Sequence, residues 1–178
     1  MDLNEELRNE YKDDEHKPNH TPCTRESVIR GFRGGEMPRQ LAEEQLKLLA
    51  EAGYSKKAIG LYASNVNVGA LANPSIVTTY RGPCGDIIKL YLKIDRTGII
   101  QDSKFCYAGC PGVATSSSAM IELVKGKTVD GAKKITEDDL LKELEGLPKT
   151  KLDCPKLAIT TLQKAIAEYE KTKGRSEI

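Results

Sequence analysis

The central stretch of the chain, residues 75–107, restricts the fold more than any other part. It contains three runs with the composition or alternation of β-strands: Ser75–Tyr80, Ile88–Ile94 and Ile99–Tyr107. The links between them, Arg81–Gly85 and Asp95–Gly98, have the length and the turn residues of hairpins. The sequence therefore predicts a small three-stranded antiparallel sheet.

The middle run also predicts which face of this sheet is buried. Its apolar residues, from Ile88 to Ile94, alternate with Lys89, Tyr91 and Lys93. Successive side chains of a strand point to opposite faces, so we expect an apolar face against the core and a second face in water.

Helical patterns precede and follow the strands. The expected helices cover residues 24–30, 38–52, 55–64, 113–125, 136–144 and 155–171. Pro38 is favoured in a first turn, Gly53 supplies a stop, and Thr136 opens a capping box. Because the strands are consecutive and the helices stand before and after them rather than between them, the sequence predicts an α+β fold in which helices pack on the sheet.

The first third of the chain divides into two segments. Residues 1–23 are polar and charged, and we expect a mobile tail. Residues 24–53 form a helical extension, which leaves 54–178 as the main domain. The helix at 38–52 has two adjoining apolar stripes: Leu41, Leu48 and Ala52, and Ala42, Leu46 and Leu49. These stripes either pack on the chain's own surface or form a homodimer.

Charge and composition exclude several classes of protein. The 27 Lys and Arg residues nearly balance the 26 Asp and Glu residues, which argues against a nucleic-acid surface. No apolar run is long enough to span a membrane, and the acidic N-terminus has no signal-peptide pattern. We therefore expect a cytoplasmic protein, whose five cysteines are thiols or metal ligands rather than disulfides.

Three cysteines lie where turns meet strands or helices. Cys84 lies in the first hairpin link, Cys110 follows the third strand, and Cys154 precedes the last helix. Cys110 and Cys154 each stand before a proline, so both are expected at helix N-termini, which favour the thiolate. Thiolate is the form that binds metal or attacks sulfur. None of the three forms the CxxC pattern of a zinc ribbon.

Several segments of the chain, taken in order, resemble the U-type iron–sulfur scaffold family, which includes IscU, the NifU N-terminal domain and SufU. The resemblance extends over about 54–173. The segments are Asn67–Gly69, Gly82–Asp86, Lys104–Phe105, Gly109–Cys110, Thr115–Ser118 and Lys151–Cys154. It implies the SufE/NifU-like fold. It also implies a scaffold, rather than an enzyme, on which [2Fe–2S] clusters are assembled and then transferred to apo-proteins.

The resemblance implies a site as well. Cys84, Asp86, Cys110 and Cys154 are expected to hold the [2Fe–2S] cluster, its iron, or zinc when no cluster is present. Cys154, or a neighbouring thiol, is expected to accept persulfide sulfur from a cysteine desulfurase, and apo iron–sulfur proteins would be the recipients. Thiolates are soft ligands that suit such clusters, whereas the oxygen of Asp86 is a harder and more exchangeable ligand.

The chain departs from the family at two places. Asp153 stands where IscU-type members usually carry histidine, and we expect it to cap the last helix. A second oxygen ligand is the alternative. The stretch 147–151 reads Leu-Pro-Lys-Thr-Lys where the usual chaperone-recognition stretch is Leu-Pro-Pro-Val-Lys. The short segment between Cys110 and Cys154 argues against the SufU subgroup.

Other interpretations stay open. The chain could be a zinc-bound persulfide sulfurtransferase, or a structural zinc domain with a closed four-ligand site. Cys106 is expected to be a packed thiol, with a minor role in sulfur transfer as the alternative. His16, His20 and Cys23 have a spacing that could bind metal.

Overall fold

The computed structural model describes residues 39–65 and 67–175. The expected tail at 1–23, the expected helix at 24–30 and the candidate ligands His16, His20 and Cys23 lie outside the described residues.

The predicted sheet is confirmed. It consists of β1 (Ile76–Arg81), β2 (Ile87–Ile94) and β3 (Ile100–Ala108), in the order β1-β2-β3 with antiparallel pairing throughout. Asp95 closes the β2–β3 turn, because its carboxylate accepts hydrogen bonds from the amides of Thr97 and Ile99.

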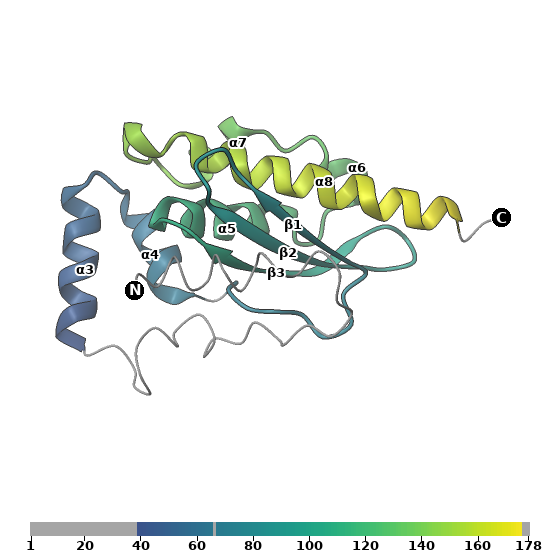
Figure 1. Cartoon of the computed structure of the whole chain (residues 1–178), viewed down its shortest axis with the longest axis horizontal. Coiled ribbons are helices and arrows are strands. Elements are labelled where there is room, and N and C mark those ends of the chain that lie inside the picture. The colour runs from purple at the N-terminus through teal and green to yellow at the C-terminus, as the bar shows by residue number, and fades with distance from the viewer. Residues whose placement is uncertain (1–38, 66, 176–178) are drawn as a thin grey trace.

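The helices lie before and after the strands, which confirms the α+β class. They are α3 (Arg39–Glu51), α4 (Lys56–Ser64), α5 (Pro111–Val124), α6 (Val129–Ala132), α7 (Glu137–Glu143) and α8 (Asp153–Arg175). Figure 1 shows α8 lying along the sheet, where it contacts β1 and β2 while α5 contacts β3. The four-residue α6 was not predicted, because one turn carries too little periodicity to detect.

The main core lies between the sheet and these two helices. Leu90 and Phe105 from the sheet, Met120 from α5, and Leu162 and Ile166 from α8 are all fully buried. The long helix α8 is therefore held along the domain by apolar contacts, and its first turn is fixed at the end where β3 runs into α5.

The second face of the sheet differs from the expectation. Lys89 and Tyr91 are each only 6% exposed, so the prediction that this face of β2 is in water is wrong for both. Alternation identifies the two faces of a strand but cannot tell whether the second is covered. Cys106, the register partner of Lys89, is fully buried as expected. It is disulfide-bonded, so the expectation of a free thiol is wrong.

Helix α3 packs on the chain's own domain along one of its two stripes. Leu49 is buried in a small cluster with Tyr54, Ala58, Ala119 of α5 and Leu144, the C-cap of α7, and Leu46 packs against it. Leu48, from the other stripe, is 64% exposed. The helix was therefore predicted correctly, whereas the stripe through Leu48 does not face the core.

Candidate functional site

Two of the predicted site cysteines lie close together where α5 and α8 begin. The sulfur atoms of Cys110 and Cys154 lie 3.7 Å apart, although the residues are 44 positions apart in the chain. Cys110 is the N-cap of α5, with Pro111 as the first helical residue, and Cys154 is in the first turn of α8. The packing of α5 against α8 brings the two sulfurs together.

Two glycines permit this close approach. A side-chain carbon on Gly112 would lie 2.8 Å from the sulfur of Cys154, and one on Gly109 would lie 2.7 Å from Cγ of Asp86. Both distances are too short for non-bonded atoms, so residues 109 and 112 leave the room that the cysteine pair and Asp86 occupy.

Asp86 lies beside Cys110. The residue is buried, and its Oδ2 lies 3.5 Å from the backbone nitrogen of Cys110, at the long limit of a hydrogen bond. The turn 82–85 positions it, since the Gly82 amide donates to the Asp86 carbonyl at 2.8 Å. One carboxylate is therefore next to the cysteine pair.

Cys84 lies at the same end of the domain, on the surface. It is exposed and free. A side-chain carbon on Gly82 would lie 3.6 Å from the Cys84 sulfur and 3.0 Å from Cδ1 of Leu157, so the turn rests on α8 about one turn after Cys154. Within 39–65 and 67–175, however, no three His, Cys, Asp or Glu residues are gathered closely enough to hold a metal ion. The complete four-residue ligand set remains a prediction.

The two thiols of the pair differ in acidity. The pKa of Cys110 is lowered to about 6, chiefly by the hydrogen bond from Cys154; burial opposes this effect, while the Val113 amide and the charge of Lys151 add to it. The pKa of Cys154 is raised, first because its thiol is the donor in that hydrogen bond and second because it is buried. At the N-terminus of α5 the Val113 amide thus favours the Cys110 thiolate, whereas the hydrogen bond to Cys110 and burial oppose ionisation of Cys154.

The start of α8 also corrects the expectation for Asp153. A 3-10 turn, Lys149–Lys151, runs directly into the helix, and Leu152 already has helical torsion angles (φ −67°, ψ −17°). Asp153 therefore lies inside the first turn and is not the N-cap, a position that requires extended backbone. It is exposed.

Lys151 and Tyr54 border the pair, and the sequence analysis assigned neither to the site. Cβ of Lys151 and the hydroxyl of Tyr54 lie 3.3 Å and 3.4 Å from the position that a Gly112 side-chain carbon would take. Burial, followed by the negative charge of Cys110 and Cys154, raises the pKa of Tyr54 to about 12. Tyr54 lies far from both cysteines in the chain, so no local pattern could have identified it.

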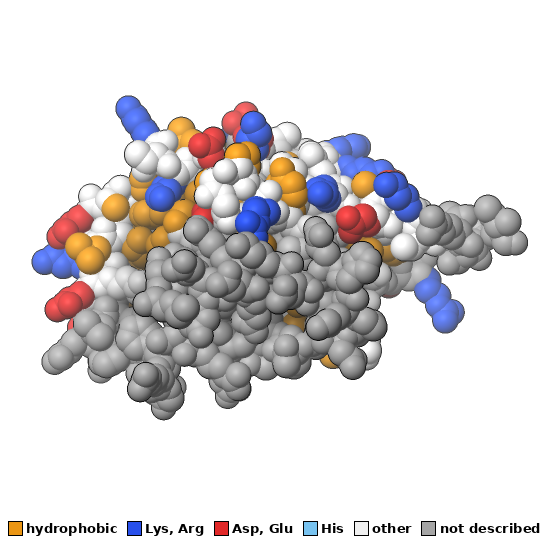
Figure 2. Space-filling model, in the orientation of Figure 1, with side chains coloured by type: hydrophobic (Ala, Val, Ile, Leu, Met, Phe, Trp, Pro, Cys, Tyr) orange, Lys and Arg blue, Asp and Glu red, His pale blue; other side chains and the backbone are white. Residues whose placement is uncertain are grey.

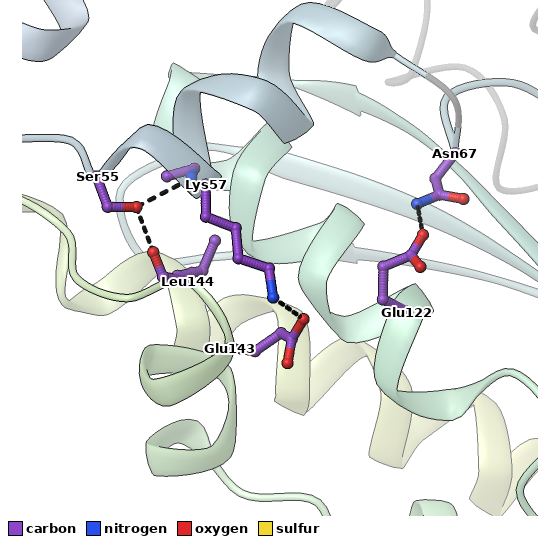
Figure 3. A network of polar contacts seen from close by, with 7 residues as sticks. Ser55, Lys57, Asn67, Glu122, Glu143 and Leu144 are labelled. Atoms are coloured by element: carbon purple, nitrogen blue, oxygen red, sulfur yellow. Dashed lines mark hydrogen bonds and ion pairs between the residues drawn. The ribbon is translucent and has the colours of Figure 1, made fainter.

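A polar network fixes the position of α4, whose first residue follows Tyr54 by two positions (Figure 3). The hydroxyl of Ser55 accepts from the amide of Ala58 at 3.0 Å and donates to the Leu144 carbonyl, and Lys57 pairs with Glu143. These contacts tie the start of α4 to α7.

A further contact in Figure 3 joins the next segment to α5. The side-chain amide of Asn67 donates to the Glu122 carboxylate at 2.8 Å. Together with the first contacts, this hydrogen bond holds α4 and Asn67 against α5 and α7.

The visible surface carries charges of both signs. Figure 2 shows Lys and Arg side chains interspersed with Asp and Glu, while hydrophobic side chains gather toward the end of the molecule where α3 and α4 lie. Leu152, which follows Lys151 in the chain, is 47% exposed. No helix in the described ranges is both long and apolar enough to cross a bilayer.

Comparison with known sequences identifies a family. The model of the NifU-like N-terminal domain family matches residues 53–176. The chain is 39% identical over 125 residues to the iron–sulfur cluster assembly scaffold protein IscU of Haemophilus influenzae, a match covering 68% of this chain and 98% of the relative. It is 37% identical over 123 residues to the Archaeoglobus fulgidus scaffold protein IscU 1, covering 68% and 80% respectively.

Solved structures show the same fold. The N-terminal part of a NifU-like protein from Brucella abortus superposes with a TM-score of 0.56 at 22% identity, covering 69% of this chain and 98% of that one. A SUF-system scaffold protein from Fervidobacterium islandicum gives 0.54 at 22% identity, covering 64% and 96%. The predicted SufE/NifU-like arrangement is thus confirmed.

Proposed function

The chain belongs to the family of NifU-like N-terminal domains, and from this membership we infer that it is a scaffold on which iron–sulfur clusters are assembled and from which they pass to apo-proteins. The family match, residues 53–176, covers the sheet and all of the helices from α4 to α8. The relatives with 37% and 39% identity carry the name of such scaffolds.

The distance between the sulfurs of Cys110 and Cys154 is the observation that supports assigning metal binding to these two residues. Two thiolates bound at about 2.3 Å to one tetrahedral metal ion lie about 3.8 Å apart. The sulfurs of Cys110 and Cys154 are 3.7 Å apart before any metal binds. The pair is therefore suited to bind one iron of a [2Fe–2S] cluster without rearrangement.

Cys84 and Asp86 would complete the ligand set. Cys84 is not gathered with the pair into a metal-binding group in the described part of the chain, so its turn would have to move toward them as iron and sulfide arrive. Asp86 is already beside Cys110. A carboxylate oxygen is a harder ligand than thiolate and suits a site that has to release what it holds.

Sulfur would reach the pair from a cysteine desulfurase. The thiolate of Cys154 attacks the outer sulfur of the desulfurase persulfide, an S–S bond forms on Cys154, and the desulfurase cysteine leaves as thiolate. Cys154 first has to lose its proton, and the Cys110 thiolate at 3.7 Å is the neighbouring group able to accept it. Leu152 gives the partner an apolar contact beside this cysteine.

Zinc chemistry is the second candidate. A separation of 3.7 Å suits zinc as well as iron, so a zinc-bound persulfide sulfurtransferase would use the same pair. A structural zinc domain fits less well, because such sites are closed by four protein ligands and Cys84 is exposed.

Anaerobic reconstitution separates these functions. The chain is incubated with iron, cysteine and a desulfurase, its visible spectrum is followed, and an apo iron–sulfur protein is then added. The scaffold function predicts that charge-transfer absorption appears on the chain and then moves to the recipient. Persulfide on Cys154 without any iron-dependent absorption would favour the sulfurtransferase.

A further inference from the structure

The hydroxyl of Tyr54 is buried, and its proton finds no acceptor in the described part of the molecule. The nearby Gly112 amide is itself a donor to this oxygen. The residue is only 7% exposed, and its ring belongs to the cluster formed by Leu49, Ala58 and Leu144. Buried polar groups are nearly always paired, because an unmade hydrogen bond destabilises the folded state. An unpaired hydroxyl next to a reactive site therefore points to a ligand that supplies the missing acceptor.

The hydroxyl faces the cysteine pair. The point where a Gly112 side-chain carbon would stand lies 3.4 Å from the Tyr54 oxygen and 2.8 Å from the Cys154 sulfur. The hydroxyl makes no hydrogen bond to either cysteine sulfur. The hydroxyl therefore lies near Cys154 without donating to its bare thiol.

The Tyr54 hydroxyl can act as a donor at neutral pH. A phenol ionises only at about pH 10, so the hydroxyl carries its proton at neutral pH. A phenol that keeps its proton is a hydrogen-bond donor and a poor metal ligand. The missing partner is thus an anionic acceptor and not a cation.

One extra sulfur atom on Cys154 would be such an acceptor. A sulfur bonded to a cysteine sulfur adds about 2.05 Å to the side chain, which extends it beyond the bare thiol. We propose that the Tyr54 hydroxyl is a pre-positioned hydrogen-bond donor for the outer sulfur of a persulfide on Cys154. The proposal deepens the scaffold function and rests on Cys154 being the sulfur acceptor.

The donor is held in place before sulfur arrives. The amide of Tyr54 donates to the Leu49 carbonyl at 3.1 Å, and Ser55 and Lys57 tie the following turn to α7 (Figure 3). The hydroxyl therefore does not have to be ordered when the persulfide forms, so most of the hydrogen-bond energy is available to stabilise the loaded state.

The variant Tyr54→Phe tests the proposal, with Tyr169→Phe as the matched control. Phenylalanine keeps the ring and removes only the oxygen. Tyr169 lies 15 residues beyond Cys154 on α8, about 22 Å along the helix axis. Each protein is equilibrated at one pH with glutathione persulfide and glutathione in fixed ratio. The Cys154 thiolate takes the outer sulfur, and glutathione leaves as its thiolate.

Persulfide on Cys154 is then quantified by alkylation and peptide mass spectrometry. We expect the equilibrium constant for loading to fall about tenfold in Tyr54→Phe, since hydrogen bonds to charged groups are among the stronger ones. Tyr169→Phe should match the parent. Equal loading of Tyr54→Phe and the parent would overturn the proposal.

Two further measurements keep the test decisive. The unloaded Tyr54→Phe chain should unfold close to the temperature of the parent, because the hydroxyl it loses has no acceptor for its proton. A clear drop would reveal a structural partner and overturn the proposal. If the variant does not fold, the tyrosine Fermi doublet in the Raman spectrum of the parent should shift on loading, and an unchanged doublet counts against the proposal.

Failure of the proposal and failure of the scaffold function can be told apart. A parent chain that takes up no sulfur on Cys154 overturns the proposal. A chain that takes up sulfur and shows the Tyr54 effect, but never builds a cluster, would overturn the scaffold function alone.

Discussion

A side-chain carbon on Gly112 would lie 2.8 Å from the sulfur of Cys154. The absence of that carbon lets Cys154 lie 3.7 Å from Cys110, at the separation two thiolates have on one tetrahedral metal ion. Gly112 is buried in the first turn of α5. Its position in the sequence did not predict that the Cys154 sulfur would occupy the space beside it.

The variant Gly112→Ala should separate the sulfur pair. Because the new methyl group overlaps Cys154, we expect the first turn of α8 to shift and the affinity for zinc to fall by at least tenfold. Competition with a chromogenic chelator measures this affinity. Gly60→Ala is the control: an added carbon there meets no atom within 4 Å, and the exchange should stabilise α4 by about 0.5–1 kcal/mol. Unchanged zinc affinity in Gly112→Ala would show that the pair does not bind the metal.

The variant Asp86→Ala should make an assembled cluster more persistent. If Asp86 is the hard, exchangeable ligand, its loss should slow transfer to an apo-protein, followed by visible absorption. Asp102→Ala is the control. It removes a carboxylate on β3 that pairs with Lys125, and this variant should transfer its cluster at the parental rate. Faster cluster loss in Asp86→Ala would instead make the carboxylate a support that the site requires.

The metal-free protein should show an acidic thiol. The Cys110 thiolate is present above its pKa of about 6 and is lost as the pH falls through that value. The rate of Cys110 alkylation by iodoacetamide should therefore rise through about pH 6. In Cys154→Ala the main cause of the low pKa is gone, so the rise should move to higher pH. Identical profiles in the two proteins would mean that the pair is not hydrogen-bonded in solution.

Leu49 should be the residue that attaches α3. It is buried against Tyr54 and α4, so Leu49→Ala should lower the free energy of unfolding by about 2–3 kcal/mol. Leu48→Ala, one position away and 64% exposed, should change it by less than about 0.5 kcal/mol. Chemical denaturation measures both. Equal effects would mean that α3 uses the other stripe.

Local patterns predicted the secondary structure well. The alternation of Ile88 to Ile94, the helical pattern at 55–64 and the capping box at Thr136 each depend on neighbours within a few positions, and the structure confirms all three elements. The cap at Asp153 was wrong because the preceding 3-10 turn keeps the backbone helical, a feature that no residue preference announces.

The site was predictable only in part. The family resemblance supplied Cys84, Asp86, Cys110 and Cys154, and the structure pairs two of them directly. Residues that shape the site through space were missed. The Tyr54 hydroxyl and the Cys154 sulfur both border the space left by Gly112, and proximity over that sequence distance leaves no periodicity to find.

The scaffold function is tested most directly by Mössbauer spectroscopy of the chain after anaerobic reconstitution with enriched iron, cysteine and a desulfurase. The parent should show the paired ferric ions of a [2Fe–2S] cluster, and Cys110→Ala and Cys154→Ala should each lose that signal while remaining folded. A parent chain that gives only loosely bound mononuclear iron, or a cluster that survives both substitutions, would contradict assembly on this cysteine pair.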